Sequence, residues 1–503
     1  MIISNLLIAA SSVVATPQNS PNIVVFLVDD MGLMDTSVPF LTNSEGLPVR
    51  HPLNYWYRTP NMQRLADQGI CFSNFYAQSV SSPSRASLMT GQNAARHRTT
   101  NWINAESNNR DTYGPMEWNW QGLSQDTPTM PKVLQQAGYK TIHIGKAHFG
   151  CNNSEAEDSL HIGFDVNIGG SAIGHPGSYY GEWGYGHIKG QKERAVPDLE
   201  KYHGTDTFLS DALTQEAVLQ VNQAIKEQKP FYLNMAHYAV HQPFQIDKRF
   251  IAHYKNSDPQ PSDWACGFAT LIEGMDKALG DLMDELERLG IAENTLIIFL
   301  GDNGGDAPFC EGRGHGSSAP LRGRKGTEFE GGMRVPFIAA WAKPDKNNPF
   351  QKRLPIKQGA MQLQLGRIMD IYPTVLSIAG CEVPENYTID GFNLTQQFKG
   401  KRNSKRPETF LMHFPHEHRG SYFTIYREGD WKVIYYYNPE TPDRPQSLLF
   451  NLKDDPEERH ECSAQHRERH REMLQKMIDR LDAEGALYPI DKQGNELRPR
   501  MII

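Results

Sequence analysis

The sequence predicts an α/β fold with a mostly parallel sheet covered by helices on both faces, followed by a smaller C-terminal α+β subdomain. Three observations predict it. Between residue 22 and about residue 384, short β-rich apolar runs alternate with helical patterns, as in chains whose helices cover a parallel sheet. The runs are largely apolar, which is typical of strands buried on both faces. After about residue 400, closely spaced β segments are followed by one charged helix.

Six segments of the first part are predicted strands: residues 23–28, 71–76, 140–144, 231–236, 295–300 and 335–340. Two helices between them have clear end signals. Residues 59–68 begin with Thr59 as the cap and Pro60 in the first turn, and residues 265–289 stop at Gly290, positions that suit these residue types.

The second part is predicted to contain strands at residues 421–426, 431–437 and 447–450 and a helix at residues 465–482. We therefore expect a first domain over residues 21–395 and a second over residues 408–490. The charged segment 401–407 between them fits a linker or a charged surface loop.

Composition limits the classes of function. The 503 residues have a net charge of -8, and Lys and Arg are scattered, so the basic stripe that nucleic-acid binding requires is missing. The six cysteines have no CxxC spacing, which argues against a zinc site or a dense disulfide framework but leaves room for one or two bridges.

The amino-terminal segment has the composition of an export signal. Residues 1–15 are short and mainly apolar, with Val13 and Ala15 at the small positions before a cleavage site, although the segment lacks a basic residue. We expect a signal peptide over 1–15 and a periplasmic or secreted bacterial protein. No other segment approaches the roughly eighteen apolar residues of a membrane span.

Polar residues follow the predicted strands. Asp29 and Asp30 close the first one, and Asp302 and Asn303 follow residues 295–300. Ligands of open α/β sheets bind at the carboxyl ends of strands. If these two strands are neighbours, three carboxylates and an amide oxygen form a hard-oxygen set that suits Ca²⁺ or Mg²⁺.

Cationic and imidazole groups occupy corresponding places. Lys146 and His148 follow residues 140–144, His241 follows residues 231–236, and Lys325 lies in a glycine-rich basic loop. Such residues can hold an anion and move protons. Together with the acidic groups, they predict metal-assisted transfer of a small tetrahedral anion, either phosphate or sulfate.

The segment from Ser81 through Pro83, Ser84 and Arg85 to Thr90 and Gly91 resembles the signature of the type I, formylglycine-dependent sulfatase family within the alkaline-phosphatase-like superfamily. The other clusters follow in the family's order. With serine at position 81, the motif resembles that of bacterial carbohydrate sulfatases in which this serine is oxidised to formylglycine (3-oxoalanine). In those proteins the oxidation is carried out by a radical maturase, which would be a transient partner of this chain.

The resemblance implies a role for each residue. One Ca²⁺ would be bound by Asp29, Asp30, Asp302, Asn303 and the oxidised residue 81. That residue would hydrate to a diol, one oxygen of which attacks sulfur, with Arg85 orienting it and Lys146 and Lys325 gripping the sulfate oxygens. His241 would protonate the leaving alcohol, and His148 would remove the second diol proton.

The expected substrate is a sulfated glycan attacked from its end, with galactose or N-acetylgalactosamine sulfate favoured. Asn101, Trp102 and His175 are expected to line a sugar subsite. Two alternatives stay open: a phosphodiesterase or phosphonate hydrolase of the same superfamily, and a glycan-binding protein in which Ser81 is never oxidised.

Overall fold

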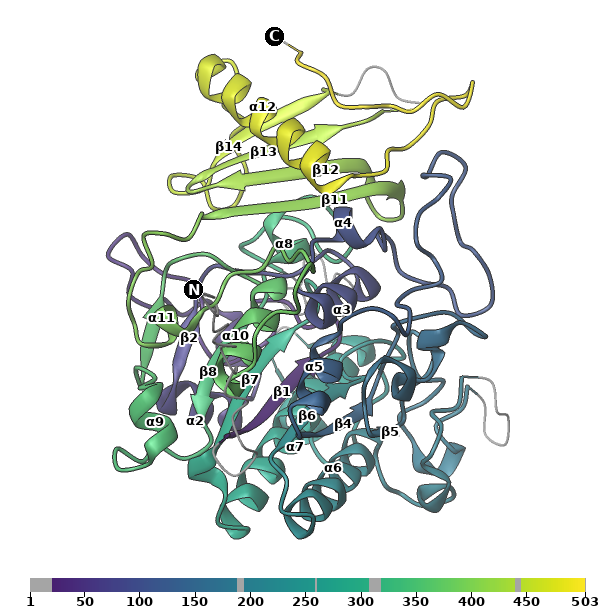
Figure 1. Ribbon diagram of the computed structural model, residues 1–503, viewed down its shortest axis with the longest axis vertical. Helices are drawn as coiled ribbons and strands as arrows, with labels where there is room; N and C mark the ends of the chain where they lie inside the picture. Colours follow the sequence, from purple (N-terminus) through teal and green to yellow (C-terminus); the bar gives the residue numbers. More distant parts are fainter. Residues whose placement is uncertain (1–19, 188–193, 258–259, 307–317, 439–444, 503) are drawn as a thin grey trace, which may run out of the picture.

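A computed structural model describes residues 20–187, 194–257, 260–306, 318–438 and 445–502 (Figure 1). Its main sheet has eight strands, in which every neighbouring pair is parallel except the pairs that β8 makes with β7 and β2. The predicted mostly parallel sheet is confirmed. In spatial order the strands are β5 (Val166–Ile168), β4 (Lys140–Gly145), β6 (Phe231–His237), β1 (Asn22–Val28), β7 (Thr295–Gly301), β8 (Phe337–Trp341), β2 (Ile70–Phe72) and β9 (Ala360–Gln362).

Helices cover both faces of this sheet, as predicted. Successive side chains of a strand point to opposite faces, so β1 contributes Phe26 and its even-numbered neighbours to one core and Val25 and its odd-numbered neighbours to another. The first core is closed by α2 (Pro60–Gln68), α6 (Leu209–Lys226) and α7 (Asp263–Arg288). The second is closed by α3 (Ser81–Thr90), α5 (Met130–Gln136) and α10 (Ile371–Ala379).

The C-terminal part is an antiparallel sheet with one long helix, at one end of the long axis of the molecule (Figure 1). One face of the sheet packs on apolar residues of the helix, such as Met477. The other face packs on Tyr76, Val80 and Met333 of the first part. The elements are β11 (Thr409–Glu417), β12 (Ser421–Glu428), β13 (Trp431–Tyr436), β14 (Ser447–Asn451) and α12 (Arg467–Glu484).

Two strand predictions differ from the structure. The predicted strand 71–76 is broken, because β3 (Phe75–Tyr76) leaves the main sheet and pairs with β10 (Gly366–Arg367). Strand β11 was not predicted at all. It contains Pro415, which normally argues against a strand because it cannot donate to the ladder, and the structure accommodates it where the pairing with β12 shifts register between Phe414 and Glu417.

One local prediction also needs correction. The Thr59 side chain does not cap α2; the carboxylate of Asp276 on α7 accepts hydrogen bonds from the backbone N–H groups of Asn61 and Met62 instead. The charged segment 401–407, predicted as a linker or a charged surface loop, is mostly exposed, and the buried guanidinium of Arg406 attaches it to Asp370.

Three further expectations concern the signal peptide, membrane spans and cysteines. The predicted signal peptide, residues 1–15, lies outside the described residues. Within the described part of the chain, no helix is long and apolar enough to cross a membrane. Five cysteines are described and all five are free thiols; Cys310 lies outside the described residues.

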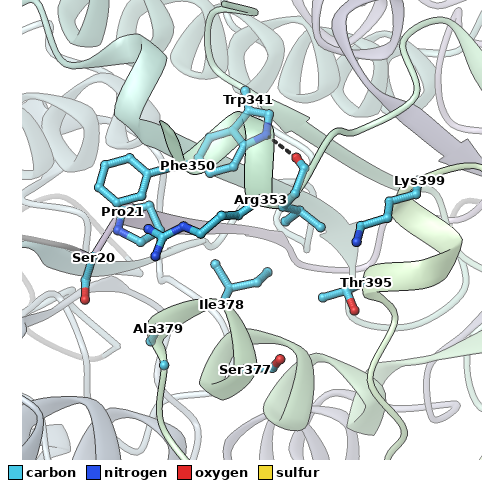
Figure 2. A pocket seen from close by; sticks show the side chains of 12 residues that line it. Ser20, Pro21, Trp341, Phe350, Arg353, Ser377, Ile378, Ala379, Thr395 and Lys399 are labelled. Atoms are coloured by element: carbon cyan, nitrogen blue, oxygen red, sulfur yellow. Dashed lines mark hydrogen bonds between the residues drawn. The ribbon is translucent and has the colours of Figure 1, made fainter. Parts of the chain in front are cut away.

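A cavity of about 250 Å³ lies beside the start of β1, whereas Asp29 and Asp30 follow the end of that strand (Figure 2). Ser20 and Pro21, just before β1, line it together with residues of α9 (Pro349–Arg353), α10 and α11 (Thr395–Phe398). The indole N–H of Trp341 donates to the Leu354 carbonyl in its wall. None of the predicted site residues lines this cavity.

Candidate functional site

The acidic residues converge at the carboxyl ends of two neighbouring strands. β1 and β7 pair in register, with Val28 opposite Gly301, so that Asp29, Asp30 and Asp302 follow directly at the same edge. All three carboxylates are buried, and their ligand atoms lie within 4.8 Å of one another. The pairing on which the sequence-based metal prediction depended is therefore present.

The backbone at Asp30 has a left-handed conformation that residues other than glycine adopt infrequently. Its φ is +57°, a conformation that typically costs about 1–3 kcal/mol and that clusters at active sites and ligand-binding segments. The backbone N–H of Asp30 donates to the Asp302 carboxylate at 3.0 Å. This hydrogen bond ties the two strand ends together.

Ser81 is the first residue of α3 and lies beside this acidic group. Its hydroxyl donates to Asp29 Oδ1 at 3.0 Å and lies 3.3 Å from Asn303 Oδ1, while Lys146 Nζ is 3.1 Å from the same hydroxyl. Pro83 is tolerated because N–H groups of the first turn have no partner within the helix. Because Ser81 begins α3, the positive end of the helix dipole lies beside the aspartates that Ser81 contacts.

The Thr-Gly end of the motif has a structural explanation. Gly91 ends α3 with φ +70°, and a Cβ there would lie 3.0 Å from the Tyr372 ring. The Gly91 carbonyl accepts hydrogen bonds from the backbone N–H groups of Asp390 and Gly391. Gly91 therefore fixes where α3 ends.

Each carboxylate of the acidic group has its own cation. Lys146 Nζ lies 2.7 Å from Asp29 Oδ2, and Lys325 Nζ lies 2.6 Å from Asp30 Oδ1. The Arg85 guanidinium donates two hydrogen bonds to Asp302 Oδ2, at 3.0 and 2.9 Å. We call the group Asp29, Asp30, Asp302, Arg85, Lys146 and Lys325 the strand-end cluster.

The pKa values show that these cations compensate the carboxylates unequally. Burial raises the pKa of Asp29 to about 8, and repulsion from Asp302 and Asp30 adds to the rise, although Lys146 opposes it. Burial also acts to raise the pKa of Asp30, but Lys325, His241 and Lys146 together hold it well below its usual range. The negative charge at Asp29 is thus poorly compensated. The oxygens of the three aspartates and of Asn303 fit a hard cation such as Ca²⁺.

Two histidines complete the site. His241 Nε2 lies 3.5 Å from Asp30 Oδ2, and its Nδ1 contacts the Gln242 carbonyl at 3.1 Å. The Nε2 of His148 contacts the Ile103 carbonyl at 2.7 Å. A carbonyl accepts only, so these two contacted nitrogens carry the protons. Burial holds the pKa of both rings well below the usual range, which makes them neutral.

A cavity of about 230 Å³ opens onto this group. His175 stacks on His241 in its wall, with ring centroids 5.3 Å apart and planes 8° apart. Asn101 is buried and is not part of the lining; its side chain accepts a hydrogen bond from the backbone N–H of Trp102. The predicted residues that line the cavity are Ser81, Trp102, Lys146, His148, His175, His241 and Lys325.

Among the described residues, the sequence did not single out five charged or imidazole groups of the lining, one of which is Glu106. His418 and Arg419 come from the loop between β11 and β12, in the part of the chain predicted as a separate subdomain. Asp306 lies four residues after Asp302, where the polar cluster after β7 was a usable signal. For Arg194 we see no signal in the sequence.

The fold and the site define an α/β protein whose strand ends bring a hard-cation donor set together with lysines and histidines around one cavity. The profile of the sulfatase family matches residues 21–381, and a second profile, that of the C-terminal region of N-sulphoglucosamine sulphohydrolase, matches residues 325–485. The chain belongs to the sulfatase family, which confirms the resemblance carried by the Ser81 motif.

Similar proteins agree with this membership. N-acetylgalactosamine-6-sulfatase of Mus musculus is 31% identical over 392 residues, which are 74% of this chain and 65% of that protein, so the chain spans just under two thirds of the relative. A sulfatase of Formosa agariphila is 27% identical, with 89% and 85% covered. The crystal structure of Ps i-CgsB in complex with k-i-k-neocarrahexaose has a TM-score of 0.72 at 25% identity, covering 95% of this chain and 96% of that one.

Proposed function

We propose that this protein hydrolyses sulfate esters of sulfated sugars. The observation that carries the proposal is the convergence of Ser81, Lys146, Lys325 and His241 on one cavity beside three buried aspartates. A sulfate group needs fixed positive charge around its oxygens, and its leaving alcohol needs a proton. The cavity supplies groups for both.

Two chemical groups that the family implies fit the residues present. Oxidation of Ser81 to formylglycine would supply the nucleophile that a serine hydroxyl cannot provide near neutral pH. A Ca²⁺ ion held by Asp29, Asp30, Asp302, Asn303 and residue 81 would supply a fixed positive charge beside it. The raised pKa of Asp29 supports the second assignment, because a bound cation would stabilise the charged form of a carboxylate that burial and the neighbouring carboxylates disfavour.

The chain's own residues position the ester and move protons. Lys146 and Lys325 face the cavity and hold sulfate oxygens, while Arg85 lies behind them and fixes Asp302. His241 points Nε2 towards the acidic group. The bound sulfate anion raises the pKa of the His241 ring, so that Nε2 becomes protonated. This nitrogen then gives its proton to the leaving oxygen. His148 keeps a proton on Nε2, which leaves Nδ1 to accept one at residue 81.

The relatives support a sugar substrate. The mouse relative is named for N-acetylgalactosamine 6-sulfate, and galactose or N-acetylgalactosamine sulfate at the end of a glycan is the substrate we propose. The Trp102 indole and the His175 ring in the cavity wall offer faces for a sugar ring. Such a substrate is consistent with the periplasmic or secreted location that we propose from residues 1–15.

The test is production of the chain together with a radical maturase, followed by two measurements. Peptide mass spectrometry should show loss of two hydrogen atoms at Ser81. Sulfate release from N-acetylgalactosamine 6-sulfate and galactose 6-sulfate should be abolished by Ser81→Ala and retained by Ser404→Ala, a change at an exposed serine outside the cavity.

Each other outcome identifies a different function. Sulfate release by Ser81→Ala at the wild-type rate would overturn the mechanism. Unmodified Ser81 combined with sugar binding and no sulfate release would identify a glycan-binding protein. Faster cleavage of a phosphodiester than of any sulfate ester would identify a phosphodiesterase of the same superfamily.

A further inference from the structure

The loop between β11 and β12 reaches from the C-terminal sheet into the wall of the cavity, where it contributes His418 and Arg419. Two contacts secure it. The backbone N–H of Gly420 donates to the Gly326 carbonyl at 3.1 Å, next to Lys325. The His418 ring faces the Trp102 indole, with centroids 6.2 Å apart. The loop between β11 and β12 therefore contacts both the segment that carries Lys325 and the part of the cavity wall formed by Trp102.

Asp306 fixes the orientation of Arg419. Both terminal nitrogens of the guanidinium contact the two carboxylate oxygens of Asp306, one of them at 2.7 Å. The Asp306 side chain is 7% exposed and that of Arg419 is 28% exposed. A guanidinium has five N–H donors, so two are used by Asp306 and three remain for another acceptor. The arrangement holds a rigid set of donors at the cavity.

The charges of the lining indicate what kind of acceptor fits. Among the described residues of the lining, and apart from the two lysines that contact the aspartates, the charged groups are two arginines, Arg194 and Arg419, and two carboxylates, Glu106 and Asp306. These charges balance, and burial lowers the pKa of His418 to about 4, so that its ring is neutral. A balanced set of donors and acceptors beside an indole suits neutral hydroxyl groups better than a second anionic group.

We propose that Arg419, held by Asp306, is a specificity-determining residue that donates hydrogen bonds to a free hydroxyl of the sulfated sugar. This inference rests on the proposed function and extends it: the preferred substrate carries one sulfate, which the lysines hold, and an unsubstituted hydroxyl within reach of Arg419. A site that hydrogen-bonds a substrate hydroxyl discriminates against an analogue that lacks it, because the donor, shielded from water by the bound ligand, is then left unpaired.

The experiment compares two probes, N-acetylgalactosamine 6-sulfate and 4-methylumbelliferyl sulfate, in the matured full-length protein. Arg419→Ala should lower the ratio of kcat/KM for the sugar to kcat/KM for the aryl sulfate by at least about tenfold. Arg419→Lys keeps the charge but not the fork of donors, so it should lower the ratio by a smaller factor. Arg459→Ala, a change at an exposed arginine outside the cavity, is the matched control and should leave the ratio unchanged.

The outcomes separate this inference from the proposed function. Wild-type protein that releases sulfate from neither probe, nor from galactose 6-sulfate, overturns the proposed function itself. Activity on the aryl sulfate alone overturns both the sugar substrate and the role of Arg419. A ratio that Arg419→Ala does not change overturns the role of Arg419 while the proposed function stands. If only the sugar is turned over, the expected loss in Arg419→Ala lies mainly in KM, and a loss confined to kcat overturns the inference.

Discussion

Two buried groups of opposite charges in the described part of the molecule differ in their access to the cavity beside Ser81. The first is the strand-end cluster. The second, which we call the junction cluster, consists of Glu330, Glu458, Lys432 and Arg427. It lies where the C-terminal sheet meets α8 (Glu330–Met333), and Lys432 Nζ contacts Glu330 at 3.2 Å and Glu458 at 2.6 Å.

The two clusters are similar in burial but differ in what they leave open. In the junction cluster the two glutamates share one lysine, and none of its four residues lines the cavity beside Ser81. In the strand-end cluster three carboxylates converge, and Lys146 and Lys325 also face the cavity. Burial and shifted pKa values therefore do not by themselves distinguish a functional site from a structural ion pair; access for a ligand does.

The largest effect on activity is expected in the strand-end cluster. Asp29→Asn removes a proposed Ca²⁺ ligand and the partner of Lys146, and it should lower kcat/KM for sulfate release by at least about 10³-fold. Added Ca²⁺ should raise the melting temperature of the wild type but not that of the variant, since a bound ion stabilises only the folded state that holds it. Asp126→Asn, at an exposed residue, is the control. Full activity in Asp29→Asn would place the chemistry elsewhere.

The largest effect on stability is expected in the junction cluster. Lys432→Met leaves two buried glutamates without their shared cation, which should lower the free energy of unfolding by about 3–5 kcal/mol. Urea titration measures this loss, and adding Glu458→Gln should restore part of it. Sulfate release per folded molecule should stay within about threefold of the wild type, and a loss of activity as large as that of Asp29→Asn would remove the distinction between the clusters.

A smaller effect should appear in the pH dependence of stability. Burial raises the pKa of Glu458 from 4.5 to about 7, although Lys432 opposes the rise. The folded protein therefore binds this proton more tightly than the unfolded chain, and stability falls as pH rises between these two values. Relative to Glu458→Gln, the wild type should lose on the order of 3 kcal/mol across this range. A difference that does not change with pH, in matched urea titrations, would show that Glu458 stays ionised.

The smallest effect is expected for an exposed ion pair. Arg288 at the end of α7 pairs with Glu285, and its side chain is 65% exposed. Because water and salt screen such pairs, Arg288→Ala should shift the melting temperature by no more than about 1 °C. If Arg288→Ala lowered the melting temperature as much as Lys432→Met does in the same experiment, burial would not account for the behaviour of the junction cluster.

The central strands and the reactive residues were predictable because their signals are local. An apolar run followed by Asp29 and Asp30 identifies both a buried strand and its functional end, and the same holds for Asp302 after β7. The short strands β5, β9 and β10 have no such signal, since two or three residues do not establish a period. Pro415 concealed β11 for the different reason that its bulge depends on the partner strand.

The rest of the site depends on contacts between distant parts of the chain. The pairing of Arg419 with Asp306 joins residues 113 positions apart, and it exists only because the C-terminal sheet packs on the first part of the molecule. No periodicity or motif specifies which loop of one sheet meets the cavity of another. The Ser81 motif, in contrast, carries its own helix start, its own proline and its own terminal glycine within eleven residues.

The burial of that motif affects the order of events in biosynthesis. Ser81 is 3% exposed, and every residue of α3 is buried against its neighbours. A modifying enzyme has to enclose its target segment, and the folded protein presents this segment only through a cavity of about 230 Å³. The proposed oxidation of Ser81 therefore has to precede folding, and the yield of active protein is set by a competition in time between the two.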